Sequence, residues 1–183
     1  MEILTLVEIP LKMKISQLAN TEFAPFYASY VAHVSDGDLL EELEISVHDL
    51  IRFVQNIPMD KYDYRYVEGK WTIKDILQHL MDSERIFAYR ALRIARNDKT
   101  PLPGFEENDY ALNAGGSERS IRDLLTELAL VRQSTIHLFK TLNEEALLRT
   151  GTASGFEISV RALGVIIIGH QKHHQKIFEE RYL

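Results

Sequence analysis

Two histidines near the C-terminus, His170 and His174, have the spacing of metal ligands on a helix. They continue an apolar series at helical spacing that includes Leu163, Ile167 and Ile177. Residues four apart lie on one face of a helix, one turn apart, so both imidazoles can reach the same ion. Neutral imidazole is a ligand of zinc, nickel and iron. Because buried imidazoles also need polar partners, two interpretations stay open: metal ligands or hydrogen-bonded core histidines.

His79 is the candidate third ligand. It lies between Ile76 and Leu80, at the edge of the apolar face of another predicted helix. A lone histidine in such a place is more often a hydrogen-bonded core residue. Three histidines from two helices, however, leave coordination positions open for water or substrate, as in a catalytic metal site. Four further histidines are interpreted as surface, rim or packing residues: His33, His48, His137 and His173.

Asp82 and Ser83 are the candidate catalytic residues. They follow His79 by three and four residues, so either can lie beside it on a helix. Either could accept the N–H of His79 and fix its tautomer, or carry a proton for a nucleophile generated at the metal. The alternative is that Asp82 and Glu84 are solvated carboxylates on the helix surface.

The composition excludes several other kinds of site. The 183 residues include no cysteine, which rules out disulfides, thiolate zinc sites, iron–sulfur clusters and a cysteine nucleophile. The chain has 21 basic and 27 acidic side chains and a formal charge of −6, which argues against binding to nucleic acid. With 45% hydrophobic and 26% charged residues, the sequence is typical of one globular domain with a substantial core.

No export or membrane signal is apparent in the sequence. Residues 1–12 lack the basic start and the small-residue cleavage site of a signal peptide. The apolar run 162–169 is far too short to span a membrane. We therefore expect a cytoplasmic protein, with either Met1 or Met13 as its true start.

Four long helices are predicted to position the histidines. The apolar residues recur at 3,4 spacing over residues 38–57, 72–97, 120–142 and 159–183. Side chains suited to N-terminal caps stand at the start of each: Asp38, Thr72, Ser120 and Ser159. Four helices that each have one apolar face can bury one another in a bundle.

Two long connections join these helices. Residues 98–119 contain two prolines and three glycines, and a loop of that length is commonly functional. We interpret it as a lid with flexible points at Gly104 and Gly115–Gly116, or alternatively as a packed surface loop. The residues that would line the mouth of a pocket are Phe105, Glu106, Glu107, Asp109 and Tyr110. In the second connection, 143–158, the stretch from Phe156 is expected to be extended.

Arginines recur along the predicted helix 72–97, at Arg85, Arg90, Arg93 and Arg96. They could pair with the acidic first helix or form a cluster for an anionic substrate. We favour pairing with the first helix, because exposed helix surfaces commonly carry such ion pairs.

Two segments of the sequence resemble the DinB-like (YfiT-like) metal-dependent superfamily. These are residues 71–105, WTIKDILQHLMDSERIFAYRALRIARNDKTPLPGF, and residues 154–177, SGFEISVRALGVIIIGHQKHHQKI. They contain the pattern of the family's metal ligands, one histidine on the second helix and His-x-x-x-His on the fourth, here His79, His170 and His174. The resemblance covers residues 20–183, which makes residues 1–19 an N-terminal extension.

The resemblance implies an all-α, four-helix bundle in up-down-down-up order, with a short N-terminal helix and long connecting loops. It also implies a divalent metal, zinc or nickel, and a homodimer. Characterised relatives include thiol S-transferases and relatives of maleylpyruvate isomerase, and many others are assigned as hydrolases.

The function implied is therefore that of a metal-dependent hydrolase or S-transferase that activates water or a low-molecular-weight thiol. Since the chain has no cysteine, such a thiol would arrive as a co-substrate. The expected partners are a small-molecule substrate and a second copy of the chain, and neither nucleic acid nor a membrane. The alternatives are a non-catalytic metal-binding or stress-response homodimer, and a dimer whose histidines are merely packed.

Overall fold

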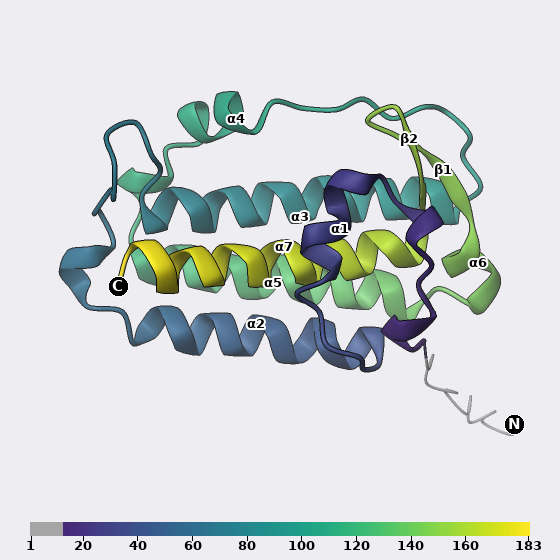
Figure 1. Ribbon diagram of the computed structural model, residues 1–183, viewed down its shortest axis with the longest axis horizontal. Coiled ribbons are helices and arrows are strands. Elements are labelled where there is room, and N and C mark those ends of the chain that lie inside the picture. The colour runs from purple at the N-terminus through teal and green to yellow at the C-terminus, as the bar shows by residue number, and fades with distance from the viewer. Residues whose placement is uncertain (1–12) are drawn as a thin grey trace, which may run out of the picture.

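The computed structural model describes residues 13–183 and shows a bundle of four long helices (Figure 1). These helices are α2 (Leu39–Gln55), α3 (Ile73–Ala95), α5 (Ile121–Lys140) and α7 (Val160–Arg181). Both α2 and α3 pack against α5 and α7. In Figure 1, α2 and α7 run in one direction while α3 and α5 run in the other. The all-α, up-down-down-up bundle predicted from the sequence is confirmed.

Each long helix begins at its predicted cap. Asp38 Oδ1 accepts hydrogen bonds from the backbone N–H groups of Leu40 and Glu41. The hydroxyls of the other three caps each accept one from the residue three positions on, in the pairs Thr72–Asp75, Ser120–Asp123 and Ser159–Ala162. These bonds satisfy backbone donors that have no partner inside the helix. The caps therefore set where each helix starts, and with it which residues share a face.

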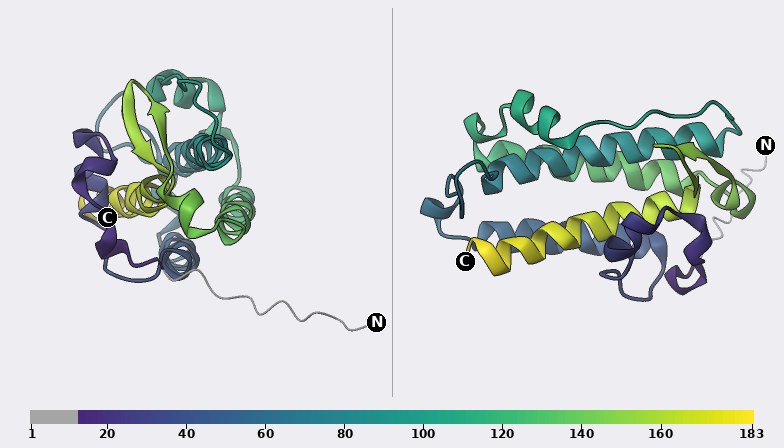
Figure 2. Two further views of the ribbon diagram at one scale, coloured as in Figure 1. Left: turned by 90° about the vertical axis from the view of Figure 1, so that its right-hand side faces the viewer. Right: turned by 45° about the horizontal axis from the view of Figure 1, so that its top comes forward.

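The connection between α3 and α5 runs the length of the bundle, because these two helices point the same way (Figure 2). It contains a short helix, α4 (Glu107–Ala114), followed by a 3-10 turn at Gly116–Glu118. The sequence predicts only a loop here. The helix escapes prediction because none of its residues is buried and no side chain caps its start, so it has no apolar periodicity to reveal it.

The smaller elements close one end and one side of the bundle. Helix α6 (Glu144–Leu148) leads into an antiparallel hairpin of β1 (Thr150–Ala153) and β2 (Phe156–Ser159), which confirms the extended stretch predicted from Phe156. Helix α1 (Ala28–Val31) lies against α7 (Figure 2). Further 3-10 turns stand at Ile15–Gln17, Asn20–Glu22, Pro25–Tyr27 and Met59–Lys61.

Part of the predicted N-terminal extension packs on the domain. Residues 1–12 lie outside the described part of the chain, but Met13 and Ile15 are buried in the core. The Ile15 N–H donates to the Gly37 carbonyl at 3.0 Å, and the Leu39 N–H donates to the Met13 carbonyl at 3.0 Å. Among residues 13–183, no helix combines the length and apolar character needed to cross a bilayer.

A buried polar network crosses the apolar interior and joins all four long helices. Arg132 of α5 donates to both carboxylate oxygens of Glu84 of α3, at 2.8 and 3.0 Å. Its remaining N–H groups reach the Leu43 carbonyl and the Ser46 hydroxyl of α2, each at 2.8 Å, and Oε1 of Gln171 of α7 at 2.9 Å. The Gln171 amide donates to the Ser46 carbonyl at 2.6 Å. Every charged group in the network therefore has partners. The interpretation of Glu84 as a solvated surface carboxylate is wrong, because its side chain is buried against Arg132 of α5.

We expect Glu84→Gln to reduce the free energy of unfolding by about 3–5 kcal/mol, because it leaves the Arg132 charge buried without an anion. Urea denaturation followed by circular dichroism measures the loss. Arg85→Gln is the matched control: it removes a half-exposed ion pair with Glu127 and should cost at most about 1 kcal/mol. Similar small losses at both positions would contradict a central role for the network.

Candidate metal centre

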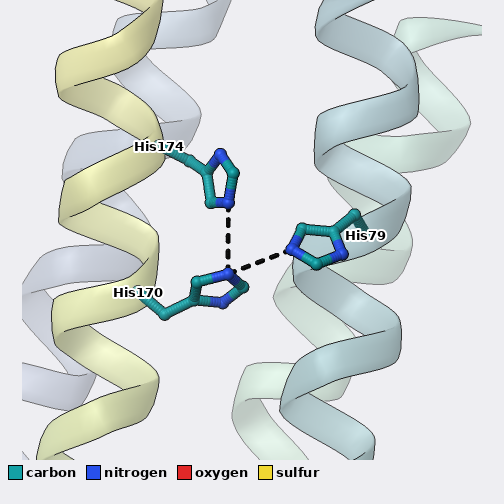
Figure 3. Close-up of side chains that lie close together, drawn as sticks. All are labelled: His79, His170 and His174. Atoms are coloured by element: carbon teal, nitrogen blue, oxygen red, sulfur yellow. Dashed lines mark hydrogen bonds between the residues drawn. The ribbon is translucent and has the colours of Figure 1, made fainter. Parts of the chain in front are cut away.

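The three predicted histidines meet between α3 and α7 (Figure 3). The Nε2 atom of His170 lies 3.0 Å from Nε2 of His79 and 3.1 Å from Nε2 of His174. One ring nitrogen from each histidine lies within 4.8 Å of the other two, and all three side chains are buried. The structure therefore brings together residues that are 91 positions apart in the sequence.

Aromatic side chains and one glycine hold the imidazoles in place. The rings of Trp71 and His79 lie 4.8 Å apart, centroid to centroid, and the ring of Tyr30 lies 5.1 Å from that of His170. Tyr30 can approach because residue 169 is glycine: a Cβ there would stand only 2.2 Å from the Tyr30 carbonyl oxygen. Gly169 thus allows α1 to cover α7 directly beside His170.

Burial keeps the histidines uncharged at neutral pH. It lowers the pKa of His79 to about 4. It also lowers the pKa values of His170 and His174 well below the ordinary value, with a further contribution from the neighbouring imidazoles, which would repel a proton. A neutral imidazole has one protonated and one unprotonated nitrogen, and the unprotonated nitrogen is the one that can bind a metal.

The arrangement of nitrogens fits a divalent cation. His170 Nε2 has two close Nε2 neighbours, yet a neutral ring nitrogen offers only one proton or one lone pair. Both contacts cannot be full hydrogen bonds, whereas lone pairs that converge suit a shared cation. Two nitrogens bound to one zinc ion at a tetrahedral angle lie roughly 3.3 Å apart, which is close to the observed 3.0 and 3.1 Å.

One feature differs from most metal sites. A metal-bound histidine commonly donates its other ring N–H to an acceptor. Within residues 13–183, Nδ1 of His174 is buried and has no hydrogen-bond partner. The orientation of His174 therefore depends on packing and on its Nε2 contact.

A cavity of about 770 Å³ opens beside His79 and His170. Its wall is formed by α3, α7, the segment before α2 and the connection from α3 to α5. The lining residues include all five predicted at the mouth of a pocket, Phe105, Glu106, Glu107, Asp109 and Tyr110. Their placement is confirmed; movement of this connection as a lid stays a prediction.

A second cavity of about 240 Å³ reaches His174 from another side, beside Trp71 and Tyr182. Glu107 and Asn108 line both cavities. The histidine cluster is therefore accessible from two directions, which meet at the start of α4.

Ser83 and Asp82 lie in different surroundings. Ser83 lines the larger cavity together with His79. Asp82 lies outside that lining and accepts hydrogen bonds from Gln78 at 3.0 Å and Arg85 at 3.5 Å. Burial raises the pKa of Asp82, while these two neighbours lower it in part. In the described chain neither residue is hydrogen-bonded to His79, so their catalytic role stays a prediction.

The predicted pairing of the α3 arginines with the first helix is wrong. Arg85 pairs with Asp82 and with Glu127 of α5, and Arg93 pairs with Asp98. Arg90 lines the larger cavity instead. The reason is that α3 packs mainly against α5 and α7 rather than against α2, and helical periodicity does not reveal which helix is the neighbour.

Sequence reasoning also missed several residues of the cavity wall. Phe26 and Tyr27 come from the 3-10 turn Pro25–Tyr27, Tyr30 comes from α1, and Ser154 comes from the tip of the hairpin. None of them belongs to a periodic pattern. The one available signal was the pair Ser154–Gly155, which is typical of a tight turn.

Comparison with known proteins places the chain in a family. Residues 42–178 match the DinB superfamily, and the protein belongs to that superfamily, as its bundle and three histidines also indicate. It is 24% identical over 137 residues to a protein of Oceanobacillus iheyensis named "putative metal-dependent hydrolase", covering 74% of this chain and 78% of that one.

Two solved structures share the fold. YfiT from Bacillus subtilis, described as a probable metal-dependent hydrolase with an unusual four-helix bundle topology, superposes with a TM-score of 0.69 at 19% identity. That match covers 78% of this chain and 82% of YfiT. The mycothiol-dependent maleylpyruvate isomerase superposes with a TM-score of 0.59 at 14% identity, over 79% of this chain and 59% of the isomerase.

We expect Gly169→Ala to destabilise the protein by about 1–3 kcal/mol, because the new methyl group must displace the Tyr30 backbone. In a solvent-exposed helix, replacing glycine by alanine would instead stabilise the protein by roughly 0.5–1 kcal/mol. Thermal denaturation measures the difference. The control is Gly104→Ala, whose Cβ would come no closer than 3.4 Å to a neighbour. A Gly169→Ala protein as stable as the parent would refute this account of the α1–α7 contact.

The metal-stripped protein should lose stability as the pH falls from 6.5 towards 4. Over that range the unfolded chain takes up a proton at residue 79, whereas the folded protein holds His79 neutral, so stability rises with pH. His79→Gln should reduce this slope by up to about 1.4 kcal/mol per pH unit. Urea denaturation at several pH values tests it, with exposed His48→Gln as control. Equal slopes in His79→Gln and the parent protein would show that His79 titrates normally.

Proposed function

We propose that this protein is a metal-dependent enzyme that acts on a small organic molecule bound in the 770 Å³ cavity. The observation that carries the proposal is the convergence of three buried, neutral histidines, of which His79 and His170 line that cavity and His174 lies beside them. Three protein ligands leave a coordination position for the reacting group, as catalytic sites do and closed structural sites do not.

The residues of the chain have separable roles in this proposal. A divalent ion, zinc or nickel, held by the three histidines would supply Lewis acidity, lowering the pKa of a coordinated water or thiol. The aromatic wall of Tyr27, Tyr30 and Phe87 keeps bulk water away and strengthens the electrostatic interactions inside. The Ser83 hydroxyl and the Glu107 carboxylate are cavity groups that can hold or pass a proton.

Hydrolysis is the reaction that we favour. It needs one organic substrate and water, and the cavity is of a size that commonly holds one such molecule. The relative named as a putative metal-dependent hydrolase and the description of YfiT as a probable one support this reaction class.

Transfer of a low-molecular-weight thiol is the second candidate. It is favoured by the smaller cavity beside His174, because two approaches to one histidine cluster suit a reaction with two substrates. The shared fold of the mycothiol-dependent isomerase is consistent with it. Since the sequence has no cysteine, the thiol would have to be a co-substrate.

A homodimer is also expected, and light scattering tests it.

Protein purified without a histidine tag should contain about one equivalent of divalent metal, because three neutral imidazoles form a single site. Elemental analysis by mass spectrometry measures the metal content. His170→Ala and His174→Ala should lose the metal, while His48→Ala, an exposed histidine of α2, should retain it. A metal-free parent protein of normal stability would remove the metal from the proposal.

Turnover separates the enzyme from a metal-binding module. The metal-loaded protein should hydrolyse a member of an ester and amide panel, or join a small thiol to an electrophilic acceptor, and His170→Ala should abolish that activity. Loaded protein without either activity would favour the non-catalytic alternative.

A further inference from the structure

Two arginines in the described chain are almost fully buried, and their charges are compensated differently. Arg132 is 1% exposed and forms a two-pronged ion pair with Glu84. Arg90 is 2% exposed, yet its hydrogen bonds go to neutral acceptors, the Pro103 carbonyl at 2.7 Å and the Ser154 hydroxyl at 3.0 Å. Among residues 13–183 no carboxylate forms an ion pair with it. A buried charge without a counter-ion is costly, so the environment of Arg90 needs an explanation.

The guanidinium of Arg90 is available to a ligand in the larger cavity. Both of these hydrogen bonds leave from Nη2. The Tyr27 hydroxyl also lies within reach of the guanidinium, and this contact partly offsets the rise that burial gives the Tyr27 pKa. Nε and Nη1 have no other acceptor among residues 13–183. Neither nitrogen is among the fully enclosed atoms that lack a partner, and Arg90 lines the 770 Å³ cavity. The N–H groups that Tyr27 does not engage therefore have access to that space, which Tyr27 also lines.

Arg90 and the histidines lie along the same wall. Residues 79 and 90 are eleven positions apart on α3, which is close to three full turns and places both on one face, about 16 Å apart along the axis. The Cα–Cβ bonds of a helix tilt towards its N-terminus, which for Arg90 is the direction of His79. Phe87 lies between them, with its ring centroid 6.0 Å from Arg90 Cζ and 6.1 Å from the His170 ring.

Two other segments fix the position of the guanidinium. The Leu102 N–H donates to the Thr152 carbonyl at 2.9 Å, and the Ser154 N–H donates to the Leu102 carbonyl at 3.0 Å. These bonds join the α3–α5 connection to the hairpin where Pro103 and Ser154 contact Arg90. The arginine is thus preorganised, which lowers the entropic cost of binding an anion.

We propose that Arg90 binds a carboxylate group of the substrate at one end of the cavity, while the reacting group of the same molecule lies at the histidines. The planar guanidinium pairs with a carboxylate through two parallel hydrogen bonds. A singly charged group is favoured over a phosphate because Glu106, Glu107 and Asp109 line the same cavity and repel a second negative charge. The aromatic wall predicts an apolar or aromatic body between the two ends.

This inference rests on the proposed function for the reacting end of the substrate, but recognition of the carboxylate does not require the metal. The probes are 3-phenylpropionate and hexanoate, each compared with its primary amide, which has the same shape and no charge. Calorimetry on metal-loaded and on metal-stripped protein should show each acid binding at least tenfold more tightly than its amide.

Arg90→Gln should reduce the affinity for the acids at least tenfold and leave the affinity for the amides and the metal content unchanged. Arg90→Lys, which retains the charge but loses the two-pronged geometry, should have an intermediate effect. The matched control is Arg93→Gln, on the same helix but paired with Asp98 outside the cavity, and it should bind like the parent protein.

Several results would overturn the proposal. These are equal affinities for acid and amide in the parent protein, or an acid preference that survives Arg90→Gln. A preference that disappears on metal removal would mean that the carboxylate binds the ion instead. If the Arg90→Gln protein does not fold, two other measurements test the proposal. They are the ratio of acid to amide affinity in the metal-stripped parent protein and the affinity of Arg90→Lys for the acids. A failed metal assay would contradict the proposed function. The ratio of acid to amide affinity in the metal-stripped protein would still test the proposal for Arg90.

Discussion

The ion pair between Arg132 and Glu84 is the interaction on which the arrangement of the helices depends. Through its five N–H groups, Arg132 reaches acceptors on α2, α3 and α7 from its own position on α5. Apolar side chains alone tolerate a shift of one helix along another, because their contacts are not directional. A buried guanidinium does not tolerate such a shift, because moving one helix would leave its charge or its polar partners without hydrogen bonds. The network therefore fixes the helices in one register.

That register determines the geometry of the histidine cluster. Gln171, which bonds to Arg132, directly follows His170, and Glu84 stands five residues after His79 on α3. The network and the histidines are thus held by the same two helices, on adjacent faces. An offset of one residue along α7 would rotate its histidines by about 100° and separate their nitrogens. The network supplies the rigid support that closely spaced ligands need.

Much of this could be predicted from the sequence, and the misses have a common cause. The four helices, their caps and the His170–His174 pair follow from local spacing, which a single chain displays directly. His79 is 91 positions from His170, and the resemblance to the DinB-like family is what joins it to the pair. The environment of Arg90 depends on a carbonyl from Pro103 and a hydroxyl from the hairpin tip, where Ser154 has φ +52° and Gly155 φ +83° in a two-residue turn. No periodicity predicts such tertiary contacts. The wrong pairing of the arginines has the same origin, because a helical face does not identify its neighbour.

The topology of the bundle also explains why the cavity exists. Because α3 and α5 run in parallel, their connection must return along the whole bundle (Figure 1). This return places Phe105 and Glu107 in the wall of the cavity that His79 and His170 also line. A simple up-and-down bundle with short loops would leave that face open to water. The resulting cavity has imidazole nitrogens at one end, aromatic rings along its wall and, at the other end, a guanidinium that forms no ion pair within residues 13–183. Both ends attract electron-rich groups, while the acidic crossover opposes high negative charge. The space therefore selects for a molecule with one anionic group, an apolar body and a separate polar group that can reach the histidines.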